Sequence, residues 1–131
     1  MKKVFLGGTS NGSLWRDDVI KKLKKINYYN PVGEHWTPEM MKEELKQRKE
    51  CDFCLYVITP KMEGAFSIAE VVDDSNKRPS KTIFCFLNED DGKTFSDTEL
   101  RSLGQVAKMV KANGATVFKT LDEVTDFLNH Q

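Results

Sequence analysis

One apolar stretch in the middle of the chain decides the fold class, and it reads Asp52-Phe53-Cys54-Leu55-Tyr56-Val57-Ile58-Thr59. Its β-branched and aromatic residues favour a strand. The segment before it, Pro38–Glu50, is mostly charged and carries a narrow apolar stripe, which is typical of a helix. A buried strand therefore follows a helix at this point of the chain.

The same alternation extends to both ends of the chain. Four further strands are predicted, at Lys3–Gly7, Tyr28–Pro31, Thr82–Leu87 and Thr116–Phe118. Helices are predicted at Ser13–Ile26, Pro38–Glu50 and Ser67–Asn76, and from Ser96 and Thr120 onward. Regular alternation implies a parallel sheet with helices on both faces. We therefore expect one doubly wound, flavodoxin-like α/β domain over residues 1–131, with a five-stranded sheet in the order 2-1-3-4-5.

Several helix ends can be predicted from capping residues. Thr37 is a natural N-cap before Pro38, which suits the first helical position. Capping boxes begin at Ser96 and Thr120, and Asn113-Gly114 favours a helix end. The acidic run Asn88–Lys93 is interpreted as a solvated surface loop.

Composition excludes several classes of protein. The 20 Lys and Arg balance the 20 Asp and Glu, whereas a dedicated binder of nucleic-acid polymers usually has a basic excess. No stretch approaches 18 consecutive apolar residues, so no membrane span is expected. The N-terminus lacks the apolar region of a signal peptide. These observations favour a soluble, cytoplasmic protein.

Three cysteines are an odd number for a disulfide framework. Cys51 and Cys54 form a Cys-x-x-Cys, which could be a redox motif, but such motifs open a helix in thioredoxin-like proteins. Here the motif lies where a helix ends and a strand begins, and Cys85 lies inside another strand, so buried structural thiols are favoured. Two distant histidines give little basis for a zinc site, and no metal is expected.

Ligands of such sheets bind outside the carboxyl ends of the strands, at the point where the strand order reverses. Two loops, 7–13 and 60–67, should meet there. The first contains Gly8, Thr9, Ser10, Asn11 and Gly12, whose glycines allow a ligand to approach the backbone. It matches neither a dinucleotide fingerprint nor a P-loop, and a plain tight turn with a Ser13 N-cap is an equal alternative.

Three further segments could carry chemistry. Gly64, Ser67 and Glu70 follow the third strand, and Glu70 is expected in the first turn of its helix, where the pattern alone favours a solvated glutamate. His35 and Trp36 lie after the second strand and could contact a flat base or form a hydrophobic lid. Glu44 has the pattern of an ordinary surface residue of its helix.

Taken in order, these segments resemble the nucleoside 2-deoxyribosyltransferases and the related 2′-deoxynucleoside 5′-monophosphate N-glycosidases. The resemblance extends from about Lys3 to Leu87. It rests on the glycine-rich turn after the first strand, on Asp52 at the start of the third strand, on Glu70 in the next helix, and on the following strand Lys81–Leu87.

The resemblance implies that Glu70 is a nucleophile that attacks the anomeric carbon and forms a glycosyl-enzyme ester. Glu44, eight residues before Asp52, would handle the proton of the departing base. His35 would line the base pocket, with Trp36 as a stacking wall. The ligand would be a nucleoside or nucleotide, with no cofactor, and Asp52 would be structural. A homodimer or larger assembly is expected, with Phe95-Ser96 as the segment nearest a partner.

The chain departs from the family pattern at three positions. Phe5 replaces a first-strand tyrosine whose hydroxyl helps to orient the nucleophile, so another group must hold Glu70. Glu44 replaces an aspartate. Asn11 stands where the N-glycosidases have an arginine that binds a 5′-phosphate. Because that charge is missing here, uncharged nucleosides remain candidate substrates.

Three functions therefore remain as hypotheses. The first is an enzyme that cleaves or exchanges the N-glycosidic bond of a 2′-deoxynucleoside or its 5′-monophosphate. The second is a nucleoside- or nucleotide-binding module with the same fold and little catalysis, which Phe5 and Glu44 favour. The third is a flavin-binding flavodoxin-like protein, which only the expected fold supports.

Overall fold

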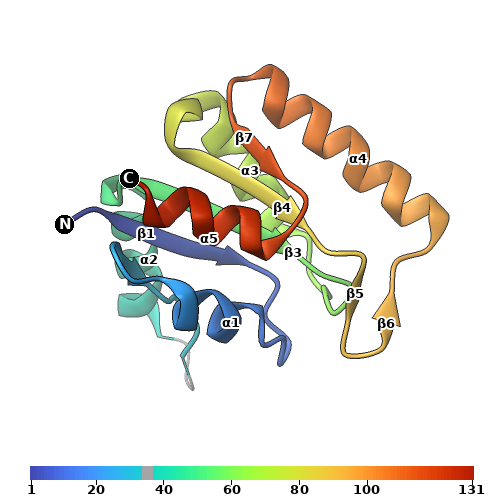
Figure 1. The fold of residues 1–131 in the computed structure, drawn as a ribbon, viewed down its shortest axis with the longest axis horizontal. Helices are drawn as coiled ribbons and strands as arrows, with labels where there is room; N and C mark the ends of the chain where they lie inside the picture. The colour runs from blue at the N-terminus through green and yellow to red at the C-terminus, as the bar shows by residue number, and fades with distance from the viewer. Residues whose placement is uncertain (34–36) are drawn as a thin grey trace.

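The computed structural model describes residues 1–33 and 37–131. A parallel sheet runs through the centre in the order β2-β1-β3-β4-β7 (Figure 1). Its strands are β1 (Lys3–Gly8), β2 (Asn27–Tyr29), β3 (Phe53–Ile58), β4 (Thr82–Phe86) and β7 (Thr116–Phe118). The five-stranded sheet and its order, 2-1-3-4-5 when the strands of this sheet are counted along the chain, confirm the prediction.

Helices cover both faces of the sheet, as predicted. They are α1 (Trp15–Lys22), α2 (Pro38–Glu50), α3 (Phe66–Lys77), α4 (Asp97–Ala112) and α5 (Leu121–Asn129), with a short 3₁₀ turn η1 at Pro79–Lys81. Helices α1 and α5 lie on one face and contact each other. Helices α3 and α4 pack together on the other face.

Strand β3 is buried at every position and contributes to two cores. Phe53, Leu55 and Val57 point into the core beneath α1 and α5. Cys54, Tyr56 and Ile58 alternate with them and point into the core beneath α3 and α4. The apolar stretch therefore fixes both faces of the sheet at once, because successive side chains of a strand point to opposite sides.

The capping residues set most of the helix ends as predicted. The hydroxyl of Thr37 accepts a hydrogen bond from the Met40 N–H at 3.2 Å. Both capping boxes are complete, at Ser96 with Glu99 and at Thr120 with Glu123. Helix ends with satisfied N–H groups are stabilised by about 1 kcal/mol each.

Helix α1 differs from the prediction at its start. It begins at Trp15 after an uncapped Leu14, so Ser13 is not an N-cap. The Ser13 hydroxyl instead donates a hydrogen bond to the Asp90 carboxylate at 2.6 Å. A hydrogen bond to Asp90, 77 positions away in the sequence, has therefore replaced the local helix cap.

The acidic run after β4 is not simply a solvated loop, which corrects the prediction. Strands β5 (Glu89–Asp90) and β6 (Lys93–Thr94) form a small antiparallel hairpin. Its turn places Asp91 and Gly92 in the left-handed region of φ. The Asp90 carboxylate accepts hydrogen bonds from the hydroxyls of Ser13 and Thr59, both at 2.6 Å. The hairpin is thus tied to the carboxyl end of the central sheet.

The three thiols are free and buried, which confirms the structural interpretation. Burial raises the pKa of Cys54 and of Cys85 to about 12, so neither forms a thiolate at neutral pH. Within residues 1–33 and 37–131, no helix is long and apolar enough to cross a bilayer. The same residues contain no group of three His, Cys, Asp or Glu side chains suited to a metal ion.

Asp52 and Phe95 both have structural roles, which for Asp52 is the role expected. Asp52 accepts a hydrogen bond from the Lys3 N–H at 2.9 Å, at the amino end of β1. Phe95 is buried in the core beneath α3 and α4, so its side chain packs within its own chain.

Candidate active site

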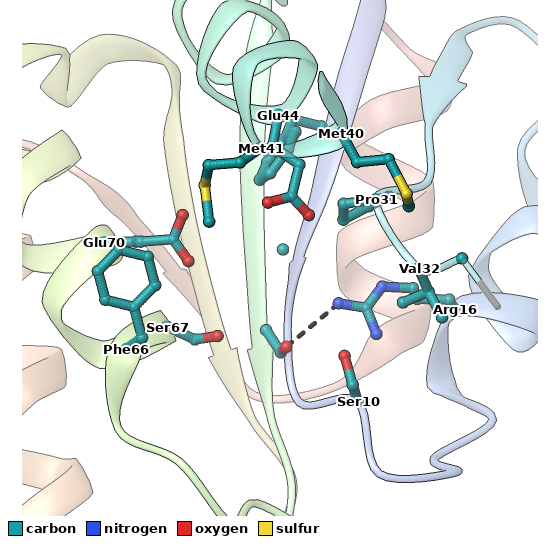
Figure 2. Close-up of a pocket in the computed structure, with 14 residues that line it drawn as sticks. Ser10, Arg16, Pro31, Val32, Met40, Met41, Glu44, Phe66, Ser67 and Glu70 are labelled. Carbon is teal, nitrogen blue, oxygen red and sulfur yellow. Dashed lines mark hydrogen bonds between the residues drawn. The ribbon is translucent and has the colours of Figure 1, made fainter. Parts of the chain in front are cut away.

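A cavity of about 330 Å³ opens at the carboxyl ends of β1 and β3 (Figure 2). This is the place predicted from the strand order. Five of the predicted site residues line it: Gly8, Ser10, Glu44, Ser67 and Glu70. Strand β1, the first loop and helices α2 and α3 each contribute at least one of them, so residues far apart in the sequence meet in one place.

The remaining predicted residues lie around this cavity. A hollow of about 240 Å³ between the first loop and the start of α3 is lined by Thr9, Asn11 and Gly64, among others. Gly12 lines a smaller one, of about 160 Å³, on the side of α1. His35 and Trp36 lie outside the described residues.

Glu70 lies in the second turn of α3, because the helix begins at Phe66. Its side chain is 17 % exposed, so the interpretation of a solvated first-turn glutamate is wrong. Burial raises the pKa of Glu70 to about 7, the Arg48 charge opposes that rise, and the Glu44 charge adds to it. A carboxyl with this pKa can change its protonation state near neutral pH.

Glu44 projects from α2 into the same cavity (Figure 2). Burial raises its pKa, and the charge of Arg16 opposes the rise. Its pattern in the sequence resembled a surface residue, and the inward position comes from the way α2 packs over the end of β1. The cavity therefore contains two carboxyls, and the charge of Glu44 favours the protonated form of Glu70.

Arg16 is a site residue that the sequence analysis missed. It is 5 % exposed and lies across the cavity from Glu70 (Figure 2). Its guanidinium donates hydrogen bonds to the carbonyl oxygens of Leu6, Gly8 and Thr9, at 2.9, 3.2 and 2.7 Å. It also lies over the Trp15 ring, 4.6 Å from the centroid.

Arg16 remains a cation at neutral pH. Burial lowers its pKa to about 10, while Glu44 and Glu70 raise it. A periodic signal was present, because Arg16 precedes Val19, Ile20 and Leu23 by three, four and seven positions on the inward stripe of α1. A charged residue on an apolar stripe is a candidate for a buried, functional position.

Arg48 is the second missed residue. Its side chain is 10 % exposed, and its Nη1 lies 3.7 Å from a Glu70 carboxylate oxygen. The sequence pattern that could have identified Arg48 is its helical spacing from Met41, Glu44 and Leu45, which places all four on one stripe of α2.

The first loop is shaped by hydrogen bonds to the loop after β3. The Thr9 N–H donates to the Val57 carbonyl oxygen, and the Thr9 hydroxyl accepts from the Thr59 N–H, both at 2.9 Å. Thr9 is 4 % exposed, so its hydroxyl is occupied within the protein. Asn11 donates from its amide to the Lys61 carbonyl oxygen at 3.0 Å. Ser10, which lies between them, is exposed and borders all three hollows.

The walls of the cavity that face the two carboxyls are largely apolar. Phe5, Pro31, Val32, Met40, Met41 and Phe66 supply most of that surface. Phe66 is exposed at the mouth. A flat aromatic ring bound among such groups would keep water away from the carboxyls.

Comparisons with known proteins agree with this architecture. The chain is similar in structure to a solved "conserved protein from Enterococcus faecalis V583", with a TM-score of 0.57 and 15 % sequence identity, over 99 % of this chain and 98 % of that one. At this identity the likeness supports the fold alone. No curated protein matches the sequence. Residues 1–89, well over half of the chain, match the family described as "Nucleoside 2-deoxyribosyltransferase like". The chain therefore belongs to the nucleoside 2-deoxyribosyltransferase-like family.

Proposed function

We infer that the protein cleaves or exchanges the N-glycosidic bond of a 2′-deoxynucleoside or its 5′-monophosphate, with Glu70 as nucleophile and Glu44 as the group that handles the proton. The observation that carries this proposal is the meeting of the two carboxyls in one cavity at the carboxyl end of the sheet. A glycosyl transfer that retains configuration needs such a pair.

The proposed first step breaks the bond between sugar and base. A Glu70 carboxylate oxygen attacks the anomeric carbon, and the electron pair of the C–N bond leaves with the base. The departing base takes a proton from the Glu44 carboxyl, either at the nitrogen of the broken bond or at another ring nitrogen. The products are a deoxyribosyl ester on Glu70 and a neutral free base.

The second step releases the sugar. Water or a second base attacks the anomeric carbon of the ester, gives its proton to Glu44, and frees the Glu70 carboxylate. Water as acceptor gives a hydrolase, whereas a second base gives a transferase. Both outcomes use the same two carboxyls.

The walls of the cavity support a ligand with one flat apolar part and one polar part. The apolar residues around Met40 and Phe66 suit the base, and His35 and Trp36 are proposed to contact it as well. Gly8, Ser10 and Ser67, with Thr9, Asn11, Gly12 and Gly64 beside them, are proposed to surround the sugar and any 5′-phosphate. Arg16 would supply a fixed positive charge on that side. No cofactor is needed for this chemistry. A homodimer or larger assembly in the cytoplasm is part of the same proposal.

The first experiment separates catalysis from binding. Purified protein is incubated with each 2′-deoxynucleoside and each 5′-monophosphate, with and without a second free base, and the products are separated by chromatography. Glu70→Gln keeps the shape of the side chain and removes its charge. Glu50→Gln, on the exposed end of α2, is the matched control. Free base or exchanged nucleoside from wild type and Glu50→Gln, but not from Glu70→Gln, supports the proposal.

The two carboxyls can be assigned by trapping the ester. Burial raises the pKa of Glu70 to about 7, which taken alone would suit the proton carrier. A 2′-fluoro substrate slows both steps, because the fluorine destabilises positive charge at the anomeric carbon, and peptide mapping by mass spectrometry then locates the sugar. A sugar on Glu70 supports the assignment, and a sugar on Glu44 reverses it. Bound ligand with no product from any substrate would favour a binding module.

A further inference from the structure

Glu70 has a buried cationic neighbour that the proposed chemistry has not yet used. Arg48 lies in the last turn of α2, and its Nη1 faces Glu70 at 3.7 Å. The hydroxyl expected on the first strand is absent, because Phe5 lines the cavity at that place. Glu70 therefore needs another partner to hold it.

The guanidinium of Arg48 is fixed on the side away from Glu70. Its Nε–H donates to both carboxylate oxygens of Asp74, at 3.2 and 3.1 Å, and its Nη2 donates to Asp73 at 2.6 Å. Asp74 is fully buried and also accepts hydrogen bonds from Tyr56 and Arg78. The backbone is held too, since the Cys54 thiol donates to the Arg48 carbonyl oxygen at 3.0 Å.

This anchoring leaves Nη1 as the nitrogen that pairs with Glu70, at 3.7 Å. A guanidinium has five donors in a rigid plane, so fixing Nε and Nη2 also fixes Nη1. An arginine held in this way can orient a carboxylate without itself touching the substrate. Lysine has one nitrogen and no rigid plane, so binding to Asp74 would not fix a second donor nitrogen beside Glu70.

We propose that Arg48, anchored on Asp74, is the positioning residue of Glu70: it orients the carboxylate for attack on the anomeric carbon. This inference rests on the proposed function of Glu70. In this chain Arg48 takes the place of the hydroxyl that Phe5 lacks.

Charged groups from three helices surround Glu70. They are Glu44 and Arg48 from α2, Asp74 from α3 and Arg16 from α1, whereas Tyr56 from β3 is a neutral neighbour because its pKa is raised. Burial and the carboxylates favour the protonated form of Glu70, whereas the two arginines favour the ionised form. Of the two, Arg48 has the larger effect.

The test is a carboxyl titration that requires no turnover. Protein labelled with ¹³C at the glutamate carboxyls is titrated by NMR, and the Glu70 signal is assigned by its loss in Glu70→Gln. Arg48→Met should raise the midpoint by about 1–3 pH units, which is the usual effect of a neighbouring charge. Lys49→Met removes the same charge from the exposed neighbouring position and should leave the midpoint unchanged.

Activity provides the second readout. A 2′-deoxyriboside of 4-nitrophenol is the substrate, because that leaving group departs without a proton and so reports on the nucleophile alone. In Arg48→Met, kcat at pH 7 should fall roughly 5-fold or more and recover as the pH rises, since the shift lowers the ionised fraction of Glu70. A merely structural role of Arg48 would lower kcat equally at every pH.

A third measurement does not depend on whether Arg48→Met folds. In wild-type protein labelled with ¹⁵N at arginine, the Arg48 side-chain signals should move with the same midpoint as Glu70, and Glu70→Gln should abolish that movement. The proposal would be overturned if the Arg48 signals did not shift as Glu70 titrates. It would also be overturned if the Glu70 midpoint were unchanged in folded Arg48→Met. If the Arg48 and Glu70 signals share a midpoint but the wild type turns over no substrate, the result counts against the proposed function. If the wild type turns over substrate but the two signals share no midpoint, the result counts against the role of Arg48 alone.

Discussion

Gly8 lies directly against Val57: a Cβ at Gly8 would be 2.1 Å from the Val57 carbonyl oxygen. Gly8 also has a φ of 121°, which side chains other than glycine rarely allow. The close approach lets the Thr9 N–H reach the same carbonyl. The first loop therefore starts from a fixed contact between β1 and β3.

Gly8→Ala is expected to push the two strands apart at the site. We expect a loss of about 3 kcal/mol or more in the free energy of unfolding, because a steric clash adds to the strain of positive φ. Gly12→Ala is the matched control, since Gly12 also has a positive φ, 73°, but open space around it. It should cost only about 1 kcal/mol. Urea unfolding measures both, and equal losses would contradict the role assigned to the contact.

Arg16→Met tests the other support of the first loop. It removes the Arg16 donor from three carbonyl oxygens, of which the Thr9 oxygen keeps the Trp15 indole N–H at 2.8 Å, and it removes the charge that opposes the raised pKa of Glu44. The loss of these charge-assisted hydrogen bonds should lower the free energy of unfolding by about 2–4 kcal/mol in all. The methionine side chain restores part of the packing that the arginine provided. The free energy of unfolding is measured with urea, beside Lys21→Met on the exposed face of α1. A loss no larger than that of Lys21→Met would show that the hydrogen bonds add little.

The sequence was enough to predict the sheet order, the faces of the sheet and the edge where the site forms, because these follow from strand and helix periodicity. Glu70 and Glu44 entered through the resemblance, since their patterns alone favoured exposed glutamates. Their burial depends on how α2 and α3 pack over β1 and β3. Arg16 and Arg48 were missed for a related reason: both are charged residues whose partners are backbone carbonyls or residues 22 and more positions away.

The contact of Ser13 with Asp90 escaped prediction because it joins segments far apart in the chain. Local propensity favoured a helix cap for Ser13 and a solvated loop for the acidic run. The hairpin instead places one carboxylate where two hydroxyls can donate to it. Such long-range hydrogen bonds override local signals of about 1 kcal/mol.

Asp90→Ala is expected to loosen the end of the sheet next to the first loop. It removes the shared acceptor of the Ser13 and Thr59 hydroxyls, which should cost about 1–3 kcal/mol. Asp91→Ala, whose carboxylate is 79 % exposed and pairs with Lys61, is the control and should cost about 1 kcal/mol, because alanine tolerates the φ of 53° less well than aspartate. Hydrogen exchange of the amides in residues 9–13 reports on the loop itself. Faster exchange in Asp90→Ala than in Asp91→Ala is expected, and equal rates would contradict the role of Asp90.

The buried Glu70 should also be visible in the stability of the protein. Its pKa in the folded state, about 7, is raised above the ordinary value of 4.5. The folded state therefore holds the proton more tightly than the unfolded state. Between pH 4.5 and 7 this group destabilises the fold progressively as the pH rises, by about 3 kcal/mol in total at pH 8.

Glu70→Gln removes this titration and keeps the shape of the side chain. We expect the variant to be as stable as wild type at pH 5 and more stable at pH 8, by roughly 2–3 kcal/mol, because glutamine has no charge to bury. Urea unfolding at both pH values measures the difference. Glu63→Gln, at an exposed position just before α3, should show no such pH dependence. A Glu70→Gln protein less stable than wild type at pH 8 would mean that the ion pair with Arg48 outweighs the cost of burial.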